Sequence, residues 1–448
     1  MKKMKEFIKK IIPPFLLSWY HFILALFGAF FYRFPSRLRR GYGGQAQKIK
    51  VIGVTGTNGK STVVELASKI LEEAGYKVAS LSSIKFKIGE KEWPNTLKMT
   101  MPGRFKIQKF LRQVVNSDCQ YAVLEVTSEG IKQHRHRFIN FEAAVFTNLT
   151  PEHIEVHGSF EKYRQTKGKL FQVTKNIHVI NLDDENAEYF LQFPANKKFS
   201  YRISGSRRTS IIGSPTSIIE AKNIQSLPSG LIFSLDNLEF NLKLLGKFNI
   251  YNALAAVSVG LSQGISLEIC KKAVEKVKGI PGRMEEVISQ PFKVFVDYAF
   301  TPAALEKVYQ TIKNNFQPQK MICVLGACGG GRDKWKRPVL GEIAARYCNE
   351  VIVTNEDPYD ENPLKIMEDI ESGFSQIPNS KIQIAKYEKI LDRRKAIGKA
   401  LSSAKRDDIV IITGKGCEPW ICVARGKKIP WDDRQVVKEE LEKLKITT

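Results

Sequence analysis

A glycine-rich segment carries the residues best suited to bind a nucleotide. It reads GVTGTNGKST at 53–62, between an apolar β-branched run and a helical pattern. Backbone N–H groups in such a loop hold phosphate oxygens, with the N-terminus of the next helix behind them. Lys60 can neutralise the β and γ phosphates, and the Ser61 hydroxyl is placed to bind Mg²⁺. The loop therefore predicts a nucleoside triphosphate site formed by Gly56, Thr57, Asn58, Gly59, Lys60, Ser61 and Thr62.

The loop departs from the general phosphate-loop pattern at one position, and a carboxylate elsewhere in the chain complements it. The general pattern has its first glycine at position 54, where this chain has Val54, and the glycines lie at 53 and 56 instead. Glu125 ends another apolar run, at a place where a carboxylate can hold Mg²⁺. A capping or ion-pairing role for Glu125 is the alternative. The loop and Glu125 together predict phosphate chemistry assisted by a metal ion.

The elements that must position these residues alternate in type. Apolar runs predict strands at 49–55, 121–126, 143–147 and 177–182, with helices between them such as 61–74. This alternation is typical of a parallel sheet covered by helices. Residues 198–245 show short strands and turn residues, which predicts an antiparallel insertion or edge. A helix rich in small residues is expected at 252–260.

A second body is expected after the IPGR turn at 280–283. Strand-like runs at 293–297, 321–326, 350–354 and 408–413 again alternate with helices. This pattern predicts a second doubly wound, Rossmann-like α/β domain. We therefore expect an α/β protein with an N-terminal segment and linker at 1–47, a central ATP-binding domain at 48–280 and a C-terminal domain at 281–448.

Composition and charge narrow the function classes. The chain has 448 residues, 43% of them hydrophobic and 26% charged, which is typical of a globular protein of two sizeable domains plus an extra segment. The formal net charge is +24, and residues 1–50 hold eleven Lys or Arg but one acid, Glu6. Such clustering favours an anionic membrane surface over a nucleic-acid groove. Because no nucleic-acid recognition motif occurs, we expect no nucleic acid partner.

The cysteines point to a reducing compartment. There are seven, an odd number, and no pair of CxxC units occurs. We therefore expect neither a disulfide framework nor a zinc site, and we expect the ATP-using body to lie in the cytoplasm.

The segment 11–32 is apolar and aromatic. It holds twenty-two residues without Lys, Arg, Asp or Glu, and about twenty apolar residues suffice to span a bilayer. Trp19, Tyr20 and Tyr32 suit an interface, whereas the Pro13–Pro14 pair, Ser18 and His21 weaken a spanning helix. We expect a helix that lies on or crosses the membrane and tethers the protein to the inner face of the plasma membrane; a buried helix packing on the next domain is the alternative. No small-residue cleavage site follows, and 41–47 predicts a flexible linker.

Ten segments together resemble the Mur ligase family, whose members build the peptidoglycan stem peptide. They follow the family's order across residues 49–448: GVTGTNGKST (53–62), LEVTSEGIKQHR (124–135), FTNLTPEHIEVHG (146–158), YRQTKGKLF (163–171), LLGKFNIYNALAA (244–256), PGRMEEV (281–287), VDYAFTP (296–302), GGGRDKWKRP (329–338), NEDPYDENP (355–363) and GKGCEPW (414–420). The chain is most similar to the members that add the third stem residue. The resemblance implies a ligase that phosphorylates an acceptor carboxylate with MgATP and lets an amine displace the phosphate.

The resemblance also implies roles for individual residues. The catalytic set is Lys60, Glu125, His153 and Lys167, and two Mg²⁺ ions are bound by Ser61, Glu125, His153 and Lys167 as a CO₂-derived carbamate. Nucleotide contacts extend to Asn148, Asn249, Arg283 and Asp297. A muramoyl-peptide acceptor is bound by Thr100, Thr127, Ser128, Gln133 and Arg135. A free amino acid is bound by Arg332, Asp357, Gly414 and Glu418. We expect a monomer.

The chain departs from the family pattern at the substrate ends. The family's N-terminal domain for the uridine nucleotide, on the order of a hundred residues, is replaced by the short basic apolar segment. A UDP-linked acceptor and a lipid-linked acceptor docked by residues 1–47 therefore both stay open. Tyr359 stands where diaminopimelate-adding members have an arginine, so lysine or another amino acid becomes the expected substrate. Cys417 replaces a histidine, and Thr100-Met101-Pro102 replaces a Thr-Thr-Pro motif. Two alternatives stay open: a ligase of the folylpolyglutamate synthase type, whose loop usually ends Gly-Lys-Gly-Ser, and a membrane-tethered ATP-binding module without ligation.

Overall fold

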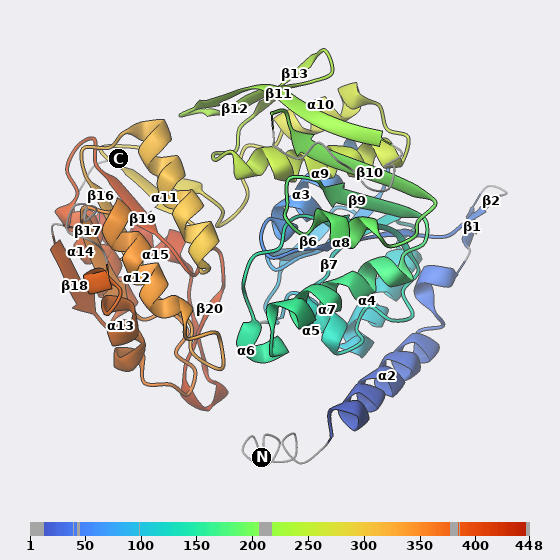
Figure 1. The fold of residues 1–448 in the computed structure, drawn as a ribbon, viewed down its shortest axis with the longest axis horizontal. Helices are drawn as coiled ribbons and strands as arrows, with labels where there is room; N and C mark the ends of the chain where they lie inside the picture. Colours follow the sequence, from blue (N-terminus) through green and yellow to red (C-terminus); the bar gives the residue numbers. More distant parts are fainter. Residues whose placement is uncertain are drawn as a thin grey trace.

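Two α/β bodies make up the protein (Figure 1). The computed structural model describes residues 13–38, 40–42, 45–97, 99–205, 217–376, 384 and 386–444. One body is built on an eleven-stranded sheet and the other on a six-stranded sheet. This arrangement confirms the predicted fold class, a central doubly wound sheet followed by a Rossmann-like α/β domain.

The eleven-stranded sheet has the order β13-β12-β11-β10-β9-β8-β3-β7-β4-β5-β6. Its bounds are β3 Lys50–Thr55, β4 Val78–Leu81, β5 Lys85–Ile88, β6 Lys91–Pro94, β7 Tyr121–Glu125, β8 Phe141–Phe146, β9 Ile177–Asn181, β10 Lys197–Ile203, β11 Ser217–Leu227, β12 Gly230–Leu235 and β13 Leu238–Leu242. Its middle is parallel and both edges are antiparallel. The antiparallel prediction for 198–245 is therefore right for the β11–β12 and β12–β13 pairs and wrong for β10, which runs parallel to both β9 and β11.

Helices cover both faces of this sheet. One face carries α3 (Lys60–Glu73), α9 (Phe248–Ser262) and α10 (Leu267–Glu275); the other carries α4 (Arg104–Asn116), α5 (Ser128–Lys132), α7 (Phe160–Val173) and α8 (Ala187–Leu191). On β3, Ile52 packs toward the α3 layer and Val51 toward the opposite layer, since successive strand residues face opposite sides. Burial on both faces explains why these strands read as continuous apolar runs.

The six-stranded sheet has the order β14-β15-β19-β16-β17-β18 and is parallel except for β14. Its strands are β14 Glu285–Ile288, β15 Lys293–Val296, β16 Met321–Leu325, β17 Glu350–Thr354, β18 Lys386–Ile390 and β19 Ile409–Ile412. Helices α11 (Pro302–Phe316), α12 (Lys336–Tyr347) and α13 (Pro363–Glu371) cover one face, and α14 (Arg393–Ser403) and α15 (Asp433–Lys443) cover the other. A small hairpin, β20 (Trp420–Cys422) and β21 (Lys428–Pro430), follows β19.

The N-terminal helix α2 spans Pro14–Phe31 and packs against α4. Of the predicted segment 11–32, residues 11 and 12 lie outside the described residues. Among the helices that the structure describes, none is long and apolar enough to cross a membrane, so the crossing prediction is wrong for this part of the chain. The predicted linker at 41–47 instead contributes to a hairpin of β1 (Arg40–Tyr42) and β2 (Gln45–Gln47).

A disulfide corrects one prediction. Cys323 on β16 and Cys348 after α12 have Cα atoms 6.2 Å apart and are joined by a disulfide, whereas counting and spacing of the cysteines predicted none. The two residues meet because α12 returns the chain to the strand beside β16, which places distant residues together. Five other cysteines are free, at 119, 270, 328, 417 and 422.

Candidate active site

A cavity of about 580 Å³ is lined by residues of both bodies. It collects side chains that follow the carboxyl ends of parallel strands, which is where ligands bind in doubly wound folds. Every site residue predicted from the sequence lines this cavity: Gly56, Thr57, Asn58, Gly59, Lys60, Ser61, Thr62, Thr100, Glu125, Thr127, Ser128, Gln133, Arg135, Asn148, His153, Lys167, Asn249, Arg283, Asp297, Arg332, Asp357, Gly414 and Glu418. The structure thus brings these residues together, and their individual roles stay predictions.

The glycine loop runs from β3 to α3 in a conformation that needs its glycines. Gly56 has φ +151° and Gly59 has φ +84°. A Cβ on Gly56 would lie 1.9 Å from Thr147 Oγ1, and one on Gly59 would lie 2.2 Å from Asn252 Oδ1. A side chain at either position would force these neighbours to shift, so the loop backbone lies close to them, with the N-terminus of α3 at its end.

The predicted nucleotide contact Asn148 holds the loop in place. Its Oδ1 accepts from Asn58 N at 2.9 Å, and its Nδ2 donates to Asn58 O at 3.0 Å. Thr147 Oγ1 donates to Asn58 O at 2.7 Å as well. Both polar groups of the Asn148 side chain are therefore occupied by the loop itself. Asn148 therefore holds the glycine loop in its conformation.

Lys60 lies at the first turn of α3 with its ammonium group turned back over the loop. Nζ donates to Thr57 O at 2.8 Å and lies 3.8 Å from Glu125 Oε1. Burial lowers the pKa of Lys60, and the nearby Glu125 carboxylate opposes that shift. A phosphate group bound in the cavity would stabilise the charged ammonium form of Lys60, which burial disfavours.

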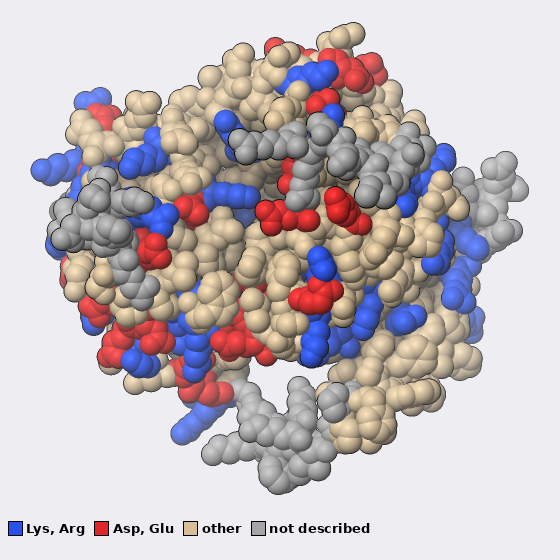
Figure 2. All heavy atoms as spheres, viewed as in Figure 1, with Lys and Arg blue, Asp and Glu red and all other residues tan. Residues whose placement is uncertain are grey.

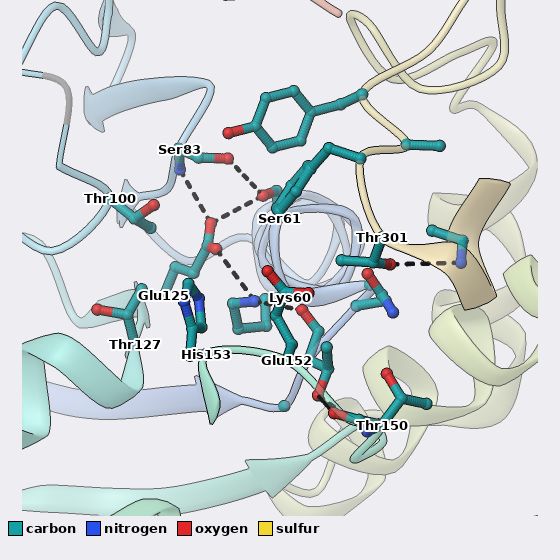
Figure 3. Close-up of a pocket in the computed structure, with 18 of the residues that line it drawn as sticks. Lys60, Ser61, Ser83, Thr100, Glu125, Thr127, Thr150, Glu152, His153 and Thr301 are labelled. Atoms are coloured by element: carbon teal, nitrogen blue, oxygen red, sulfur yellow. Dashed lines mark hydrogen bonds and ion pairs between the residues drawn. The ribbon is translucent and has the colours of Figure 1, made fainter. Parts of the chain in front are cut away.

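Ser61 and Glu125 converge on one point (Figure 3). Ser61 Oγ donates to Glu125 Oε2 at 2.8 Å, and the same carboxylate oxygen accepts from Ser83 N at 2.9 Å. Ser61 Oγ also lies 2.8 Å from Ser83 Oγ. Hydroxyl and carboxylate oxygens are the ligands that Mg²⁺ prefers. The arrangement fits a magnesium ion bound by Ser61 and Glu125, and Ser83 is a neighbour that the sequence did not reveal.

His153 points into the same cavity (Figure 3). Burial lowers its pKa to about 2, assisted by the charges of Arg332 and Lys167. Its backbone is left-handed, with φ +58°, at the start of α6 (Ile154–His157). None of the described residues hydrogen-bonds its ring, which packs edge-on near Tyr163. A neutral imidazole with free ring nitrogens can serve as a metal ligand.

Lys167 is a buried lysine, and among the described residues no carboxylate forms a salt bridge with its ammonium group. It lies on α7, is 1% exposed, and donates from Nζ to Gly56 O at 2.7 Å. Its Nζ also lies 4.6 Å from the centre of the Tyr163 ring. Burial places the pKa of Lys167 well below its usual value, and the charge of Lys60 adds to that shift. Both effects favour the neutral amine over the ammonium form, and the side chain lies next to the glycine loop.

The predicted acceptor residues form one wall of the cavity. Thr127 caps α5 by accepting from Gly130 N at 3.1 Å, and Ser128 Oγ lies 3.2 Å from His157 Nε2. The buried Arg135 donates to the carbonyl oxygen of Met101 and, at 2.8 Å, to Gln133 Oε1. Arg135 thereby links the loop after α5 to the segment that carries Thr100.

Arg283 reaches from the second body toward Ser83, which lies beside the candidate magnesium ligands. Its NH2 donates to Ser83 Oγ at 3.3 Å, and its guanidinium lies 4.4 Å from the Tyr298 ring centre. Two other predicted nucleotide contacts are already used by the protein. Asp297 accepts from Met284 N at 2.7 Å and Ala299 N at 2.6 Å, whereas Asn249 Nδ2 donates to Leu245 O. The hydrogen bonds of these two side chains hold the backbone at the rim of the cavity. The spacing of residues in the sequence could not indicate this role.

The predicted amino-acid side holds three carboxylates. Lys415, which the sequence did not reveal, donates to Asp357 Oδ2 at 3.0 Å and to Glu418 Oε2 at 2.6 Å. Glu356 is buried, its Oε1 accepts from the Cys328 thiol at 2.9 Å, and its Oε2 has no hydrogen-bond partner among the described residues. Burial raises the pKa of Glu356. Arg332 and Gly414 line the same part of the cavity.

Two contacts join the bodies beside His153. Lys336 Nζ donates to Glu152 Oε1 at 2.9 Å, and both side chains are 2% exposed. Asp333 accepts from the backbone N–H groups of Ile154 and Glu155 at 3.2 and 3.0 Å. The second body thus fixes the turn that presents His153. In the sequence, these residues were noted only as part of the family-like segments 146–158 and 329–338, and no role was predicted for them.

Lys336→Met is expected to destabilise the contact between the bodies by about 3–5 kcal/mol, because Glu152 would keep a buried carboxylate without its counter-ion. Burial already raises the pKa of Glu152. Small-angle scattering should show a larger radius of gyration for this variant. Lys336→Met/Glu152→Gln, which removes both charges, is expected to recover the compact state. Equal scattering from wild type and the single variant would contradict this role.

No ready-made metal cluster of acids, histidines or cysteines accompanies these residues. Within the described ranges, no group of three or more such side chains is placed to hold an ion. The candidate metal ligands are therefore the Ser61–Glu125 pair and His153, with the remaining ligands to come from a bound nucleotide, water or a modified Lys167.

Two family models match the chain. Residues 54–260 match the Mur ligase middle domain, and residues 282–416 match the Mur ligase glutamate ligase domain. A UDP-N-acetylmuramoyl-L-alanyl-D-glutamate–2,6-diaminopimelate ligase of Syntrophomonas wolfei is 38% identical over 405 residues, 89% of this chain and 80% of that protein. A UDP-N-acetylmuramyl-tripeptide synthetase of Roseiflexus is 35% identical over 422 residues, 90% of this chain and 80% of its own length.

Solved structures resemble the fold as well. A UDP-N-acetylmuramoyl-L-alanyl-D-glutamate–2,6-diaminopimelate ligase matches with a TM-score of 0.58 and 29% identity, over 89% of this chain and 79% of that one. Folylpolyglutamate synthase of Mycobacterium tuberculosis matches with a TM-score of 0.68 and 17% identity, over 88% of this chain and 92% of that one. The second likeness concerns the fold alone.

Proposed function

Because this chain belongs to the Mur ligase family, we propose that it is an ATP-dependent ligase that adds the third amino acid to a muramoyl-peptide acceptor in peptidoglycan synthesis. One observation carries this proposal. The phosphate loop with Lys60, the Ser61–Glu125 pair and the buried Lys167 line one cavity with Arg332 of the second body. The proposed phosphate, metal, acceptor and amino-acid sites therefore share one cavity.

The proposed reaction proceeds by phosphorylation and displacement. The acceptor carboxylate attacks the γ phosphate of ATP, which releases ADP and forms an acyl-phosphate. The amine of the incoming amino acid then attacks the acyl carbon, and phosphate leaves as the amide forms. Lys60 and Arg283 offset the charge on the transferred phosphate, and the enclosure between the bodies excludes water from the acyl-phosphate.

We propose Mg²⁺ as the required ion, two ions in all, with Ser61, Glu125 and His153 among their ligands. The ions would offset phosphate charge and orient the γ phosphate. We further propose that Lys167 becomes a carbamate: its neutral amine attacks CO₂ and loses a proton, which converts a buried amine into an anion. Low exposure and a lowered pKa support this modification, since only the neutral amine reacts.

On the substrate side we propose an amino acid without a second carboxylate. Tyr359 lines the cavity at the position where an arginine would pair with the distal carboxylate of diaminopimelate. A Cβ at Gly330 would lie 2.5 Å from Tyr359 Cδ2, so the tyrosine ring packs on that glycine. Thr100, Thr127, Ser128, Gln133 and Arg135 are proposed for the acceptor, and Arg332, Asp357, Gly414 and Glu418 for the amino acid.

We propose a cytoplasmic monomer that contacts the membrane through the segment 11–32. Exposed apolar side chains of α2 support the contact.

A phosphate-release assay tests the function. We expect release only when ATP, a muramoyl dipeptide acceptor and an amino acid are all present. Lysine is expected to exceed diaminopimelate in kcat/KM by about tenfold or more, because the missing arginine would contribute one bidentate ion pair. ATP hydrolysis that ignores both substrates would contradict ligation, and activity with diaminopimelate alone would contradict the assignment of Tyr359.

A further inference from the structure

Helix α2 has two faces of opposite character. On one face, Ala25 and Ala29 are buried, and a Cβ on Gly28 would lie 3.4 Å from Arg104 O, so this face lies directly on α4. The other face, here called the apolar face, consists of Phe15, Trp19, Ile23, Phe27, Phe30 and Phe31. Phe30 and Phe31 are 71% and 70% exposed, and Trp19 is 62% exposed. Large contiguous apolar patches on a protein surface mark a site that contacts a partner or a membrane.

The charges around the apolar face are positive. Helix α2 contains no Asp or Glu, and residues 1–50 hold eleven Lys or Arg against one acid. Arg33 and Arg37 are exposed just after the helix, and Lys106 and Lys109 are exposed on the neighbouring α4. Figure 2 shows the tan surface of α2 at the lower right, with Lys and Arg beside it. Apolar and aromatic side chains bordered by cations suit the interface of an anionic bilayer.

The buried face of α2 contacts the acceptor wall of the cavity. Ser18 Oγ lies 2.8 Å from His134 Nε2, and the Phe22 ring packs edge-on against the same histidine. Arg104, which contacts His21 of α2, donates from Nε to Gln133 O at 3.0 Å. Gln133 and Arg135 line the cavity on either side of His134. The helix therefore lies directly behind the loop proposed to bind the acceptor.

We propose that α2 docks in the headgroup region of an anionic bilayer, so that the acceptor end of the cavity lies beside the membrane and receives an acceptor carried on a lipid. The helix lies on the membrane without crossing it. A second copy of the chain suits the apolar face less well, because an isologous contact would bring the basic ends of two helices together. The part that concerns the acceptor rests on the proposed ligase function; the docking does not.

Vesicle flotation of the full chain tests the docking. Wild type is expected to float with vesicles of phosphatidylcholine and phosphatidylglycerol in equal parts, and less with phosphatidylcholine alone. Phe27→Asp/Phe30→Asp is expected to weaken binding by about tenfold or more, because two apolar anchors become charged. The matched control is Tyr387→Asp/Leu391→Asp, which adds the same charge at side chains 50% and 44% exposed on the second body and should bind as wild type does.

A second variant separates charge from apolar contact. Arg33→Gln/Arg37→Gln leaves the helix sequence intact and is expected to weaken binding to the anionic vesicles only. Wild type that stays unbound with both vesicle types would overturn the proposal, as would equal binding by Phe27→Asp/Phe30→Asp. A wild-type dimer that this variant dissociates, without vesicle binding, would assign the apolar face to self-association instead.

Turnover then tests the acceptor. With a muramoyl dipeptide on a polyprenyl pyrophosphate in vesicles, Phe27→Asp/Phe30→Asp is expected to raise KM by about tenfold with kcat unchanged, matching its loss of vesicle binding. The KM for a soluble UDP-linked dipeptide should not change. Equal KM values for the vesicle-borne acceptor would overturn this part. If no acceptor supported turnover by wild type, the ligase proposal would fail, and flotation would still decide the docking.

Discussion

Lys60→Met is expected to lower kcat/KM for phosphate release by about a thousandfold or more, because one cation that offsets charge on the transferred phosphate is lost. The methionine keeps the length of the buried side chain. Lys60 is the ammonium group nearest the Glu125 carboxylate in the described site, and its Nζ lies directly over the loop. Steady-state assays at saturating acceptor and amino acid, with ATP varied, would measure the effect.

Lys69→Met is the matched control for this variant. Lys69 lies on the same helix, pairs with Glu72 and is 40% exposed. Its replacement should change kcat/KM little, since exposed ion pairs contribute little. Retention of more than about a tenth of wild-type activity by Lys60→Met, far above the loss expected for an electrostatic group, would refute the role of Lys60.

Lys167→Met is expected to reduce kcat by about a hundredfold to a thousandfold, because the proposed carbamate would be lost from the metal site. Thermal stability should stay equal or rise, since the variant replaces a buried amine that burial already disfavours in its charged form. A carbamate on wild type would appear as a carbonyl resonance after incubation with ¹³C-labelled bicarbonate. Lys167→Met should lack that resonance.

Added short carboxylates discriminate between two roles of Lys167. If the carbamate acts as an anion beside the metal ions, acetate or propionate should restore part of the activity of Lys167→Met. Lys169→Met, on the exposed side of the same helix, should keep both activity and the resonance. Full activity of Lys167→Met without any added carboxylate would show that the carbamate is not needed.

Strands buried on both faces were predictable from the sequence, because their runs are predominantly apolar and rich in β-branched residues. Residues 350–354 match β17 in full, and 49–55 differs from β3 by one residue. Edges were harder. Residues 198–245 predicted antiparallel strands, yet β10 and β11 run parallel to each other, because the residues of a strand do not by themselves determine its pairing direction. The disulfide between Cys323 and Cys348 was missed because the fold, and not the spacing in the sequence, brings these two cysteines together.

The candidate site was predictable where one short motif carries the chemistry, as in the loop before Lys60. It was less predictable where partners are distant. Lys336 and Glu152 are 184 residues apart, and no periodicity in the sequence pairs them. The sequence could not show that Asn148 and Asp297 use their polar groups on the backbone. The types of the side chains indicated which residues belong to the candidate site, and only the folded structure shows their hydrogen-bond and ion-pair partners.

The contact between Lys336 and Glu152 has a kinetic consequence. Glu152 immediately precedes His153, and Asp333 fixes the backbone just after it, so the turn that presents the imidazole is completed only when the second body is in place. Ordering of that turn and enclosure of the cavity are therefore expected to occur together. Under the proposed function, phosphoryl transfer is therefore expected to be gated by closure of the two bodies, and ATP hydrolysis without substrates is expected to stay slow while they are apart.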